Sequence, residues 1–249
     1  MLTPTPHYAD LAIRPQIVRD APLLTFFLSG NSSALRRCIP SPLSPHPGAR
    51  IILNMWSLPD PENTTGFGEP GPMGIAYLAA EVAGEEGFTA DGVTRFPGRV
   101  WLDHWGSSAA LRGYAHRASG LEIRPGAISL EFRNDVVTAT LGLGDRTVVT
   151  ARARLGRNRL KTITGHSIYY AEREAEAGGR EVARFEVPWI SDAYTADDPS
   201  VDFAFPEEEA ALRFVTNGRQ SVAAVSFRRI TLVPYLAHNV VKTGRRSSG

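Results

Sequence analysis

The sequence predicts an α+β, β-rich fold: a large antiparallel sheet or barrel with one long helix and one or two short ones. Most apolar residues fall in short runs or alternate with polar residues, as they do in strands. Residues 107–119 instead have apolar residues at helical spacing. Gly and Pro, 23 and 18 of the 249 residues, separate these segments. Because β-rich barrels often reach about 250 residues as one unit, we expect a single domain over residues 1–249.

The expected strands follow a Pro-rich, irregular arm at residues 1–22. Each strand is an apolar or alternating run bounded by Gly, Pro or charged residues. They cover residues 23–29, 50–57, 73–82, 99–104, 127–133, 136–142, 147–155, 167–172, 181–190, 222–228 and 231–236. Gly144-Asp145-Arg146 predicts a hairpin turn between two of them, and residues 59–72 predict a long loop of the kind that covers a site. Residues 242–249 are expected to be a polar, frayed tail.

Three segments predict helices. A short helix at residues 34–38 is expected to begin after a Ser32 or Ser33 cap and to end before Pro40. The long helix within residues 107–119 is expected to end at Gly120. Residues 207–215 begin with glutamates, which favour the positive N-terminal end of a helix.

Charge and cysteine content exclude several classes of partner. The chain has 27 Lys and Arg against 26 Asp and Glu, a formal charge of +1, so no global field favours nucleic acid or a membrane surface. The single cysteine, Cys38, cannot form an intrachain disulfide, which fits a reducing compartment. No signal-peptide pattern and no run of about 18 apolar residues is present. We therefore expect a cytoplasmic protein that binds neither nucleic acid nor membrane and acts on a small molecule.

Familiar cofactor and nucleophile motifs are absent from the sequence. It contains no phosphate-binding loop, no GxGxxG segment opening a helix after a strand, and no GxSxG nucleophile elbow. Its six histidines are scattered without metal-ligand spacing, and there is no pair of cysteines for zinc. We expect no cofactor and no metal, and these motifs alone define only a β-rich domain.

A resemblance to a known family begins near the N-terminus. A strand is followed by Asn31-Ser32-Ser33-Ala34-Leu35-Arg36-Arg37 and then by Ile39-Pro40-Ser41-Pro42-Leu43. This resembles the acetoacetate decarboxylase family, which has an Ala-Leu-Arg-Lys-type helix and a Pro-x-Pro-Leu phrase there. Residues 66–84, the helix up to Gly120, and residues 222–240 resemble later parts of the family pattern. The resemblance implies an antiparallel β cone or barrel, a small-molecule pocket and a homo-oligomer.

The sequence departs from the family where the catalytic lysine pair would stand. The resemblance implies a Gly-aromatic-Pro-Lys-Lys-type phrase after the helix, in which one lysine forms an imine and its neighbour lowers the pKa of that lysine. Here the phrase is Gly120-Leu121-Glu122-Ile123-Arg124. Arg124 cannot replace a lysine, because guanidinium stays protonated and is a poor nucleophile. The only lysines are Lys161 and Lys242.

Four residues are candidates for catalysis. Glu69 matches the family's pocket glutamate, where a carboxylate shielded from water can move protons; the alternative is a solvated loop residue. Asn54 stands where the resemblance implies a second pocket carboxylate, and would polarise a carbonyl. His116 and Glu122 flank the missing lysine phrase as replacement acid or base, with a surface position as the alternative for His116.

The remaining candidates would bind and orient the substrate. Two arginines could anchor a carboxylate or carbonyl, one of them near the family's pocket arginine, and aromatic residues could shape the pocket, although core packing and helix capping are the competing roles. The six are Arg19, Arg95, Trp56, His104, Trp105 and Tyr77.

These observations favour one function and leave two others open. The leading hypothesis is a lyase or isomerase of the dehydratase or cyclase type, acting without an imine on a β-keto, enone or polyketide-like intermediate of natural-product metabolism. The first alternative is a β-keto acid decarboxylase that uses Lys161. The second is a non-catalytic protein that keeps the pocket to bind a metabolite. The sequence does not identify the substrate.

Overall fold

Strands dominate the chain in this computed structural model, which describes residues 17–58, 64–65, 73–90, 95–174, 179–207, 214–232 and 236–241. The strands are β1 (Ile17–Ser29), β2 (Arg50–Leu58), β3 (Thr64–Thr65), β4 (Met73–Thr89), β5 (Arg95–Gly106), β6 (Arg124–Pro125), β7 (Ala127–Arg133), β8 (Val136–Leu143), β9 (Arg146–Glu174), β10 (Arg180–Phe203), β11 (Gly218–Gln220), β12 (Val222–Leu232) and β13 (Leu236–Val241). The helices are α1 (Ser32–Cys38) and α2 (Ala109–Ser119). The predicted β-rich class, with a large antiparallel sheet and few helices, is confirmed.

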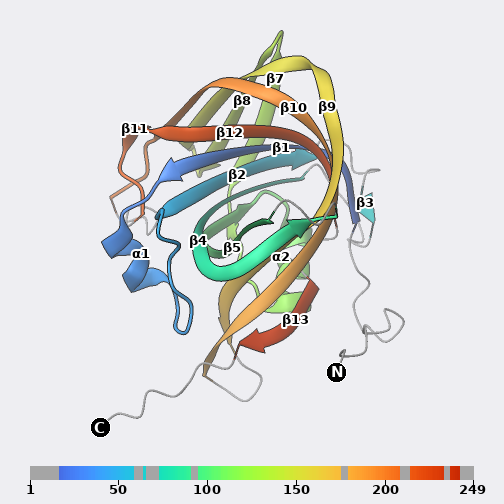
Figure 1. Cartoon of the computed structure of the whole chain (residues 1–249). Helices are drawn as coiled ribbons and strands as arrows, with labels where there is room; N and C mark the ends of the chain where they lie inside the picture. Colours follow the sequence, from blue (N-terminus) through green and yellow to red (C-terminus); the bar gives the residue numbers. More distant parts are fainter. Residues whose placement is uncertain are drawn as a thin grey trace.

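Seven of the described strands form a closed ring (Figure 1). Neighbours pair in the order β10, β12, β1, β2, β4, β5 and β9, and β9 pairs in turn with β10 to complete the circuit. These pairs are antiparallel except that of β5 with β9, where Arg99 and Val100 lie parallel to Tyr169 and Tyr170. Ring closure removes free strand edges and encloses an interior.

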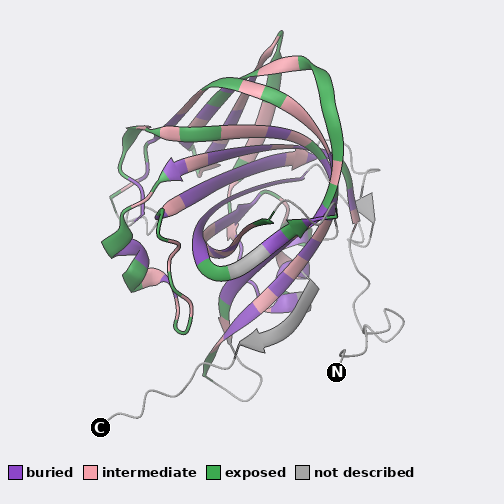
Figure 2. Cartoon of the chain, viewed as in Figure 1, coloured by how far each residue is buried: buried purple, intermediate pink, exposed green. Residues whose placement is uncertain are grey.

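An outer layer packs on one wall of this ring. The first part of β9 pairs with β8, and β8 pairs with β7. Alternate residues of β8, such as Val137 and Leu141, join Leu24, Phe26 and Leu53 of β1 and β2 in a fully buried cluster that we call the outer cluster. Figure 2 shows the resulting concentration of buried residues on β1 and β2. Since successive strand residues point to opposite faces, the other residues of β1 and β2 face the ring interior.

Helix α2 packs against a second, inner cluster. Its Leu111 and Tyr114 are buried together with Tyr77 and Phe185 of the ring. The helix ends as predicted at Gly120, whose φ of 67° is the left-handed conformation that glycine adopts without strain. Neither described helix is long and apolar enough to cross a membrane.

Several expected boundaries were wrong. Strand β1 begins at Ile17 and pairs with β12 from Val18 onward, so residues 17–22 are not part of an irregular arm. The separate strands expected at 147–155 and 167–172 are one continuous β9. Residues 157–162 between them are exposed and polar apart from Leu160, so they lack the apolar pattern of a strand, but their backbone pairs with β10. Strand β10 likewise continues past residue 190 to Phe203.

Other expectations lie wholly or partly outside the described residues. The tail at 242–249 and the first 16 residues are outside, and so are Glu69 and most of the helix expected at 207–215. In the expected loop at 59–72, Thr64 and Thr65 form β3 against the start of β1. The turn at Gly144 and Asp145 between β8 and β9 is confirmed.

The cap of α1 is Asn31, not the serines expected from the sequence. Its Oδ1 accepts hydrogen bonds from the backbone N–H groups of Ser33 and Ala34, both at 3.0 Å. Two donors that the helix itself leaves unsatisfied are therefore satisfied by one side chain.

We expect Asn31→Ala to lower the free energy of unfolding by about 1 kcal/mol, because both N–H groups lose their acceptor. The matched control is Ser32→Ala, whose effect should stay within about 0.5 kcal/mol, since an exposed side chain outside a cap contributes little. Urea unfolding followed by circular dichroism measures both. Equal losses in the two variants would contradict this assignment of the cap.

Candidate functional site

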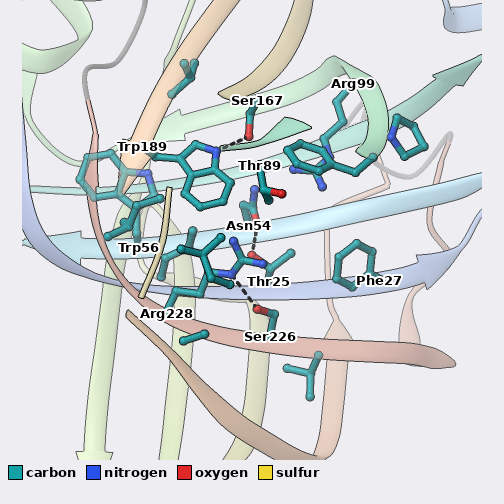
Figure 3. Close-up of a pocket in the computed structure, with 18 of the residues that line it drawn as sticks. Thr25, Phe27, Asn54, Trp56, Thr89, Arg99, Ser167, Trp189, Ser226 and Arg228 are labelled. Carbon is teal, nitrogen blue, oxygen red and sulfur yellow. Dashed lines mark hydrogen bonds between the residues drawn. The ribbon is translucent and has the colours of Figure 1, made fainter. Parts of the chain in front are cut away.

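The ring encloses a cavity of about 590 Å³ that all seven of its strands help to line (Figure 3). Alternate residues of each strand face it, as Leu23, Thr25 and Phe27 of β1 do. A volume of this size is typical of sites for small organic ligands.

Aromatic side chains make one rigid wall of the cavity. The Trp101 indole stacks on the Tyr169 ring, with centroids 4.7 Å apart and an 8° angle between planes. Trp189 also lines the cavity, and its indole N–H donates a hydrogen bond to Ser167 Oγ at 3.0 Å. A Cβ on Gly165 would lie 2.7 Å from the Trp189 ring and 2.6 Å from the Phe88 carbonyl oxygen, so only glycine lets this indole pack here.

A row of polar residues crosses three neighbouring strands. The registers place Thr25 opposite Asn54, and Asn54 opposite Tyr77. Thr25 Oγ1 donates to Asn54 Oδ1 at 2.5 Å, and Asn54 Nδ2 donates to the Tyr77 hydroxyl at 2.5 Å. The pairing of β5 with β9 extends the row, because the Tyr77 and Tyr169 hydroxyls are 2.8 Å apart and Arg99 Nη1 donates to Tyr169 at 3.3 Å.

The polar row has one hydroxyl proton left for a ligand. Asn54 donates to Tyr77 and Arg99 donates to Tyr169, so neither partner accepts a tyrosine proton. The two hydroxyls share one proton in the hydrogen bond between them. Since each tyrosine carries one proton, the second hydroxyl proton has no acceptor among the described residues, and both tyrosines line the cavity. The row therefore presents one O–H donor to the cavity.

Burial keeps this donor protonated. The pKa of Tyr77 is raised well above its usual value, first by its burial and then by the neighbouring Tyr169. A buried phenol flanked by a second phenol disfavours the charged phenolate. The Tyr77 hydroxyl consequently keeps its proton and remains a hydrogen-bond donor throughout the neutral range.

Charges in the cavity are predominantly positive. Glu81, 1% exposed, is bound by Arg50 at 2.6 Å. Arg99 lies against Phe96 and Tyr169, and its buried Nε has no hydrogen-bond partner among the described residues.

Arg228 is the second guanidinium that faces the cavity. It stacks over Trp189 with its Cζ 5.1 Å from the ring centroid, and its Nε donates to Ser226 Oγ at 3.2 Å. Burial first, and then the nearby charge of Arg99, lower the pKa of Arg228. The group stays cationic near neutrality, because guanidinium starts from a very high pKa.

His104 lies directly behind the polar row. It is opposite Tyr77 in the register of β4 with β5, and the two rings meet edge to face with centroids 5.3 Å apart. Burial lowers the pKa of His104 to about 3. The imidazole is therefore neutral and packs against Tyr77, where it supports the ring rather than carrying charge.

Five residues singled out from the sequence line the cavity: Asn54, Trp56, Tyr77, Arg95 and Lys161. Asn54 uses its oxygen and one N–H on Thr25 and Tyr77, so it holds the row in place instead of polarising a carbonyl directly.

The other predicted site residues lie elsewhere. His116 and Glu122 are exposed and bind each other at 2.8 Å, and Arg19 is exposed on β1; none of the three lines the cavity. Trp105 is buried in the outer cluster, where it stacks on Phe205. Glu69 lies outside the described residues, so its role stays a prediction.

The sequence analysis did not identify several residues of the polar row and several charged residues of the cavity lining: Thr25, Glu81, Arg99, Tyr169 and Arg228. Each is a polar residue on the inward face of an apolar strand, which is the signal that could have found them. Two of them, Arg99 and Tyr169, become neighbours only through the pairing of β5 with β9. No group of three or more His, Cys, Asp or Glu among the described residues could hold a metal ion.

Fold and site together define a closed β cone that encloses a polar, aromatic-walled cavity. No protein-family model and no curated sequence matches the chain. Among solved structures it is similar to acetoacetate decarboxylase from Legionella pneumophila, with a TM-score of 0.72 and 13% identity over 96% of this chain and 92% of that one.

Two other solved structures are similar to the chain. The enduracididine biosynthesis enzyme MppR, complexed with pyruvate, has a TM-score of 0.59 and 14% identity over 94% of this chain and 93% of that one. An acetoacetate decarboxylase-like enzyme from Sphingomonas wittichii RW1 has a TM-score of 0.57 and 14% identity over 91% and 92%. The chain therefore has the acetoacetate-decarboxylase-like fold that the sequence suggested.

We expect stability to fall as the pH is lowered from about 6.5 toward 3, because of His104. Its folded form stays neutral down to a pKa of about 3, whereas the unfolded chain binds a proton near 6.5. The unfolded state thus binds more protons in this window, which costs up to about 1.4 kcal/mol per pH unit. Urea unfolding at several pH values measures the slope.

The comparison with His104→Gln isolates this effect from the carboxylates, which titrate in both proteins. Between pH 6 and 4, the slope of the unfolding free energy against pH should be smaller in the variant by about the contribution of one proton. An unchanged slope in His104→Gln would contradict a buried neutral imidazole.

Proposed function

We propose that the protein is an enzyme that activates the carbonyl group of a β-keto, enone or polyketide-like substrate by hydrogen bonding and acid/base catalysis, without a cofactor and without an imine. The observation that carries this proposal is the row from Thr25 to Arg99, which leaves one tyrosine proton directed at the cavity. Such a donor stabilises negative charge on a carbonyl oxygen, and a fixed donor in a water-poor site does so more strongly than water.

The proposed reaction begins with enolisation. The substrate carbonyl accepts a hydrogen bond from the spare O–H of the Tyr77–Tyr169 pair, and Arg99 and Asn54 donate hydrogen bonds to the two phenolic oxygens. A carboxylate removes a proton from the carbon next to the carbonyl. Glu81, fixed by Arg50, is the carboxylate among the described cavity residues, and Glu69 is the candidate from the sequence.

Two outcomes of the enolate fit this site. It can expel the hydroxyl group of the β carbon as water, protonated by the carboxyl group that took the first proton, which is a dehydration. Alternatively it can attack a second carbonyl of the same substrate, whose oxygen then takes up that proton, which closes a ring. The aromatic wall would hold the substrate in a reactive conformation for either outcome. Similarity to an enzyme named for enduracididine biosynthesis supports a place in natural-product metabolism.

A second candidate is decarboxylation through an imine on Lys161, because Lys161 lines the cavity. Against it, the segment where the family pattern has its lysines contributes the buried apolar residues Leu121 and Ile123. Lys161 is also exposed on β9, and a nucleophilic amine is usually created by burial or by a second cation next to it.

We expect the double variant Tyr77→Phe with Tyr169→Phe to lower kcat by about 100- to 1000-fold on whichever β-keto or enone substrate is found, since removing one oxyanion donor has an effect of that size. Either single variant should lose less, because the tyrosine that remains still has one hydroxyl proton free for the substrate. Product formation followed by mass spectrometry measures it. The matched control is Tyr170→Phe, which changes the next residue of β9, buried in the outer cluster on the opposite face. Turnover that survives the double variant unchanged would overturn the proposed role of the row.

Borohydride trapping separates the two candidate reactions. With a β-keto acid and borohydride, we expect no increase in the mass of the peptide that contains Lys161, because the proposed chemistry forms no imine. A covalent adduct at Lys161 would establish the decarboxylase alternative. Saturable binding of the substrate panel with no product from any member would instead indicate a non-catalytic binding protein.

A further inference from the structure

The positive charge of the cavity exceeds what its own acids neutralise. Among the described lining residues, the partly buried guanidiniums of Arg99 and Arg228 have no carboxylate within ion-pair distance, and the buried carboxylate, Glu81, is already bound to Arg50. Charges that are partly withdrawn from water are normally paired in proteins. The excess predicts a ligand that brings negative charge with it.

Arg228 is the cation best prepared to receive that charge. Ser226 holds its Nε, and the Trp189 ring fixes the plane of the guanidinium from one side. Neither Nη atom has a hydrogen-bond partner among the described residues, and no described carboxylate lies within ion-pair distance. A guanidinium held by its Nε and its face has its paired Nη donors left for an external carboxylate, which arginine binds through two parallel hydrogen bonds.

The volume and the lining of the cavity indicate the size and shape of the rest of the ligand. At about 30 Å³ for each water-sized group, 590 Å³ holds about 20 such groups. A keto acid of about seven heavy atoms would fill about a third of that space. The walls are flat aromatic surfaces, among them Trp101, Trp189 and Phe96, which pack best against a flat, conjugated body.

We propose that the cavity binds an extended, flat, conjugated carboxylic acid, with its carboxylate on Arg228 and its body along Trp189 toward the tyrosine row. This proposal rests on the proposed function, because it takes the same cavity as the substrate site. It adds a binding residue, Arg228, and a ligand class much larger than a simple keto acid.

Binding of 2-naphthoate, measured by isothermal titration calorimetry on the full chain, tests the proposal without any turnover. The neutral 2-naphthamide is the match for shape, and acetoacetate is the match for charge. We expect 2-naphthoate to bind at least 10-fold more tightly than either. Equal affinity of the acid and the amide would overturn the anion site, and equal affinity of 2-naphthoate and acetoacetate would overturn the extended body.

Variants assign the effect to Arg228. Arg228→Gln should weaken 2-naphthoate about 10- to 100-fold, as expected for a hydrogen-bonded charge, and leave 2-naphthamide unchanged. Arg228→Lys keeps the charge but loses the bidentate geometry, so its affinity for 2-naphthoate should lie between those of the parent protein and Arg228→Gln. This second variant keeps the test valid if Arg228→Gln fails to fold. The control is Arg229→Gln, which removes the same charge one residue away, where Arg229 is exposed and binds Asp20 at 2.7 Å. An equal loss in Arg229→Gln would overturn the assignment.

Failure of this proposal is distinguishable from failure of the proposed function. Selective, Arg228-dependent binding of 2-naphthoate together with no turnover of any substrate would support the acid site and refute the catalysis. Turnover that is lost in the double variant Tyr77→Phe with Tyr169→Phe, with equal binding of acid and amide, would support the catalysis and refute the acid site.

Discussion

Closure of the ring between β5 and β9 is the constraint on which the site depends. The contact is short and parallel, and pairs Arg99 and Val100 with Tyr169 and Tyr170. It places the cation of one strand beside the phenol of another, about 70 residues apart in sequence. Without it, the row Thr25, Asn54 and Tyr77 would end at a hydroxyl with no cation behind it.

The fold was largely predictable because alternation is a local signal. The apolar runs located the strands, and the helical spacing with Gly120 located α2, since burial of one face imposes those periods on the sequence. The prediction of strands failed where neither face of a strand is buried. Residues 157–162 of β9 are exposed, so only backbone pairing with β10 keeps them extended, and no side-chain pattern records it.

The site was less predictable, because its members are joined by register rather than by spacing. Asn54 and Tyr77 were found, one through a family resemblance and one as a large aromatic, and both line the cavity. Arg99, Tyr169 and Arg228 were not, because an arginine within a strand gives no sign of which face is enclosed until the ring is known. His116 and Glu122 flank a segment that matters in the family pattern, but they bind each other at the surface and do not line the cavity.

The pairing of β1 with β12 has a consequence for how the chain is made. These strands lie near opposite ends of the sequence, with Asp20 and Thr231 joined across 211 positions. During synthesis, β1 can pair with β2 early, but its other edge stays open until nearly the whole chain has emerged. An apolar strand with an open edge, here carrying Phe26 and Phe27, is a template for association with other chains. Nascent copies would therefore depend on chaperones or on rapid completion, and truncation before β12 would release an aggregation-prone sheet rather than a smaller folded protein.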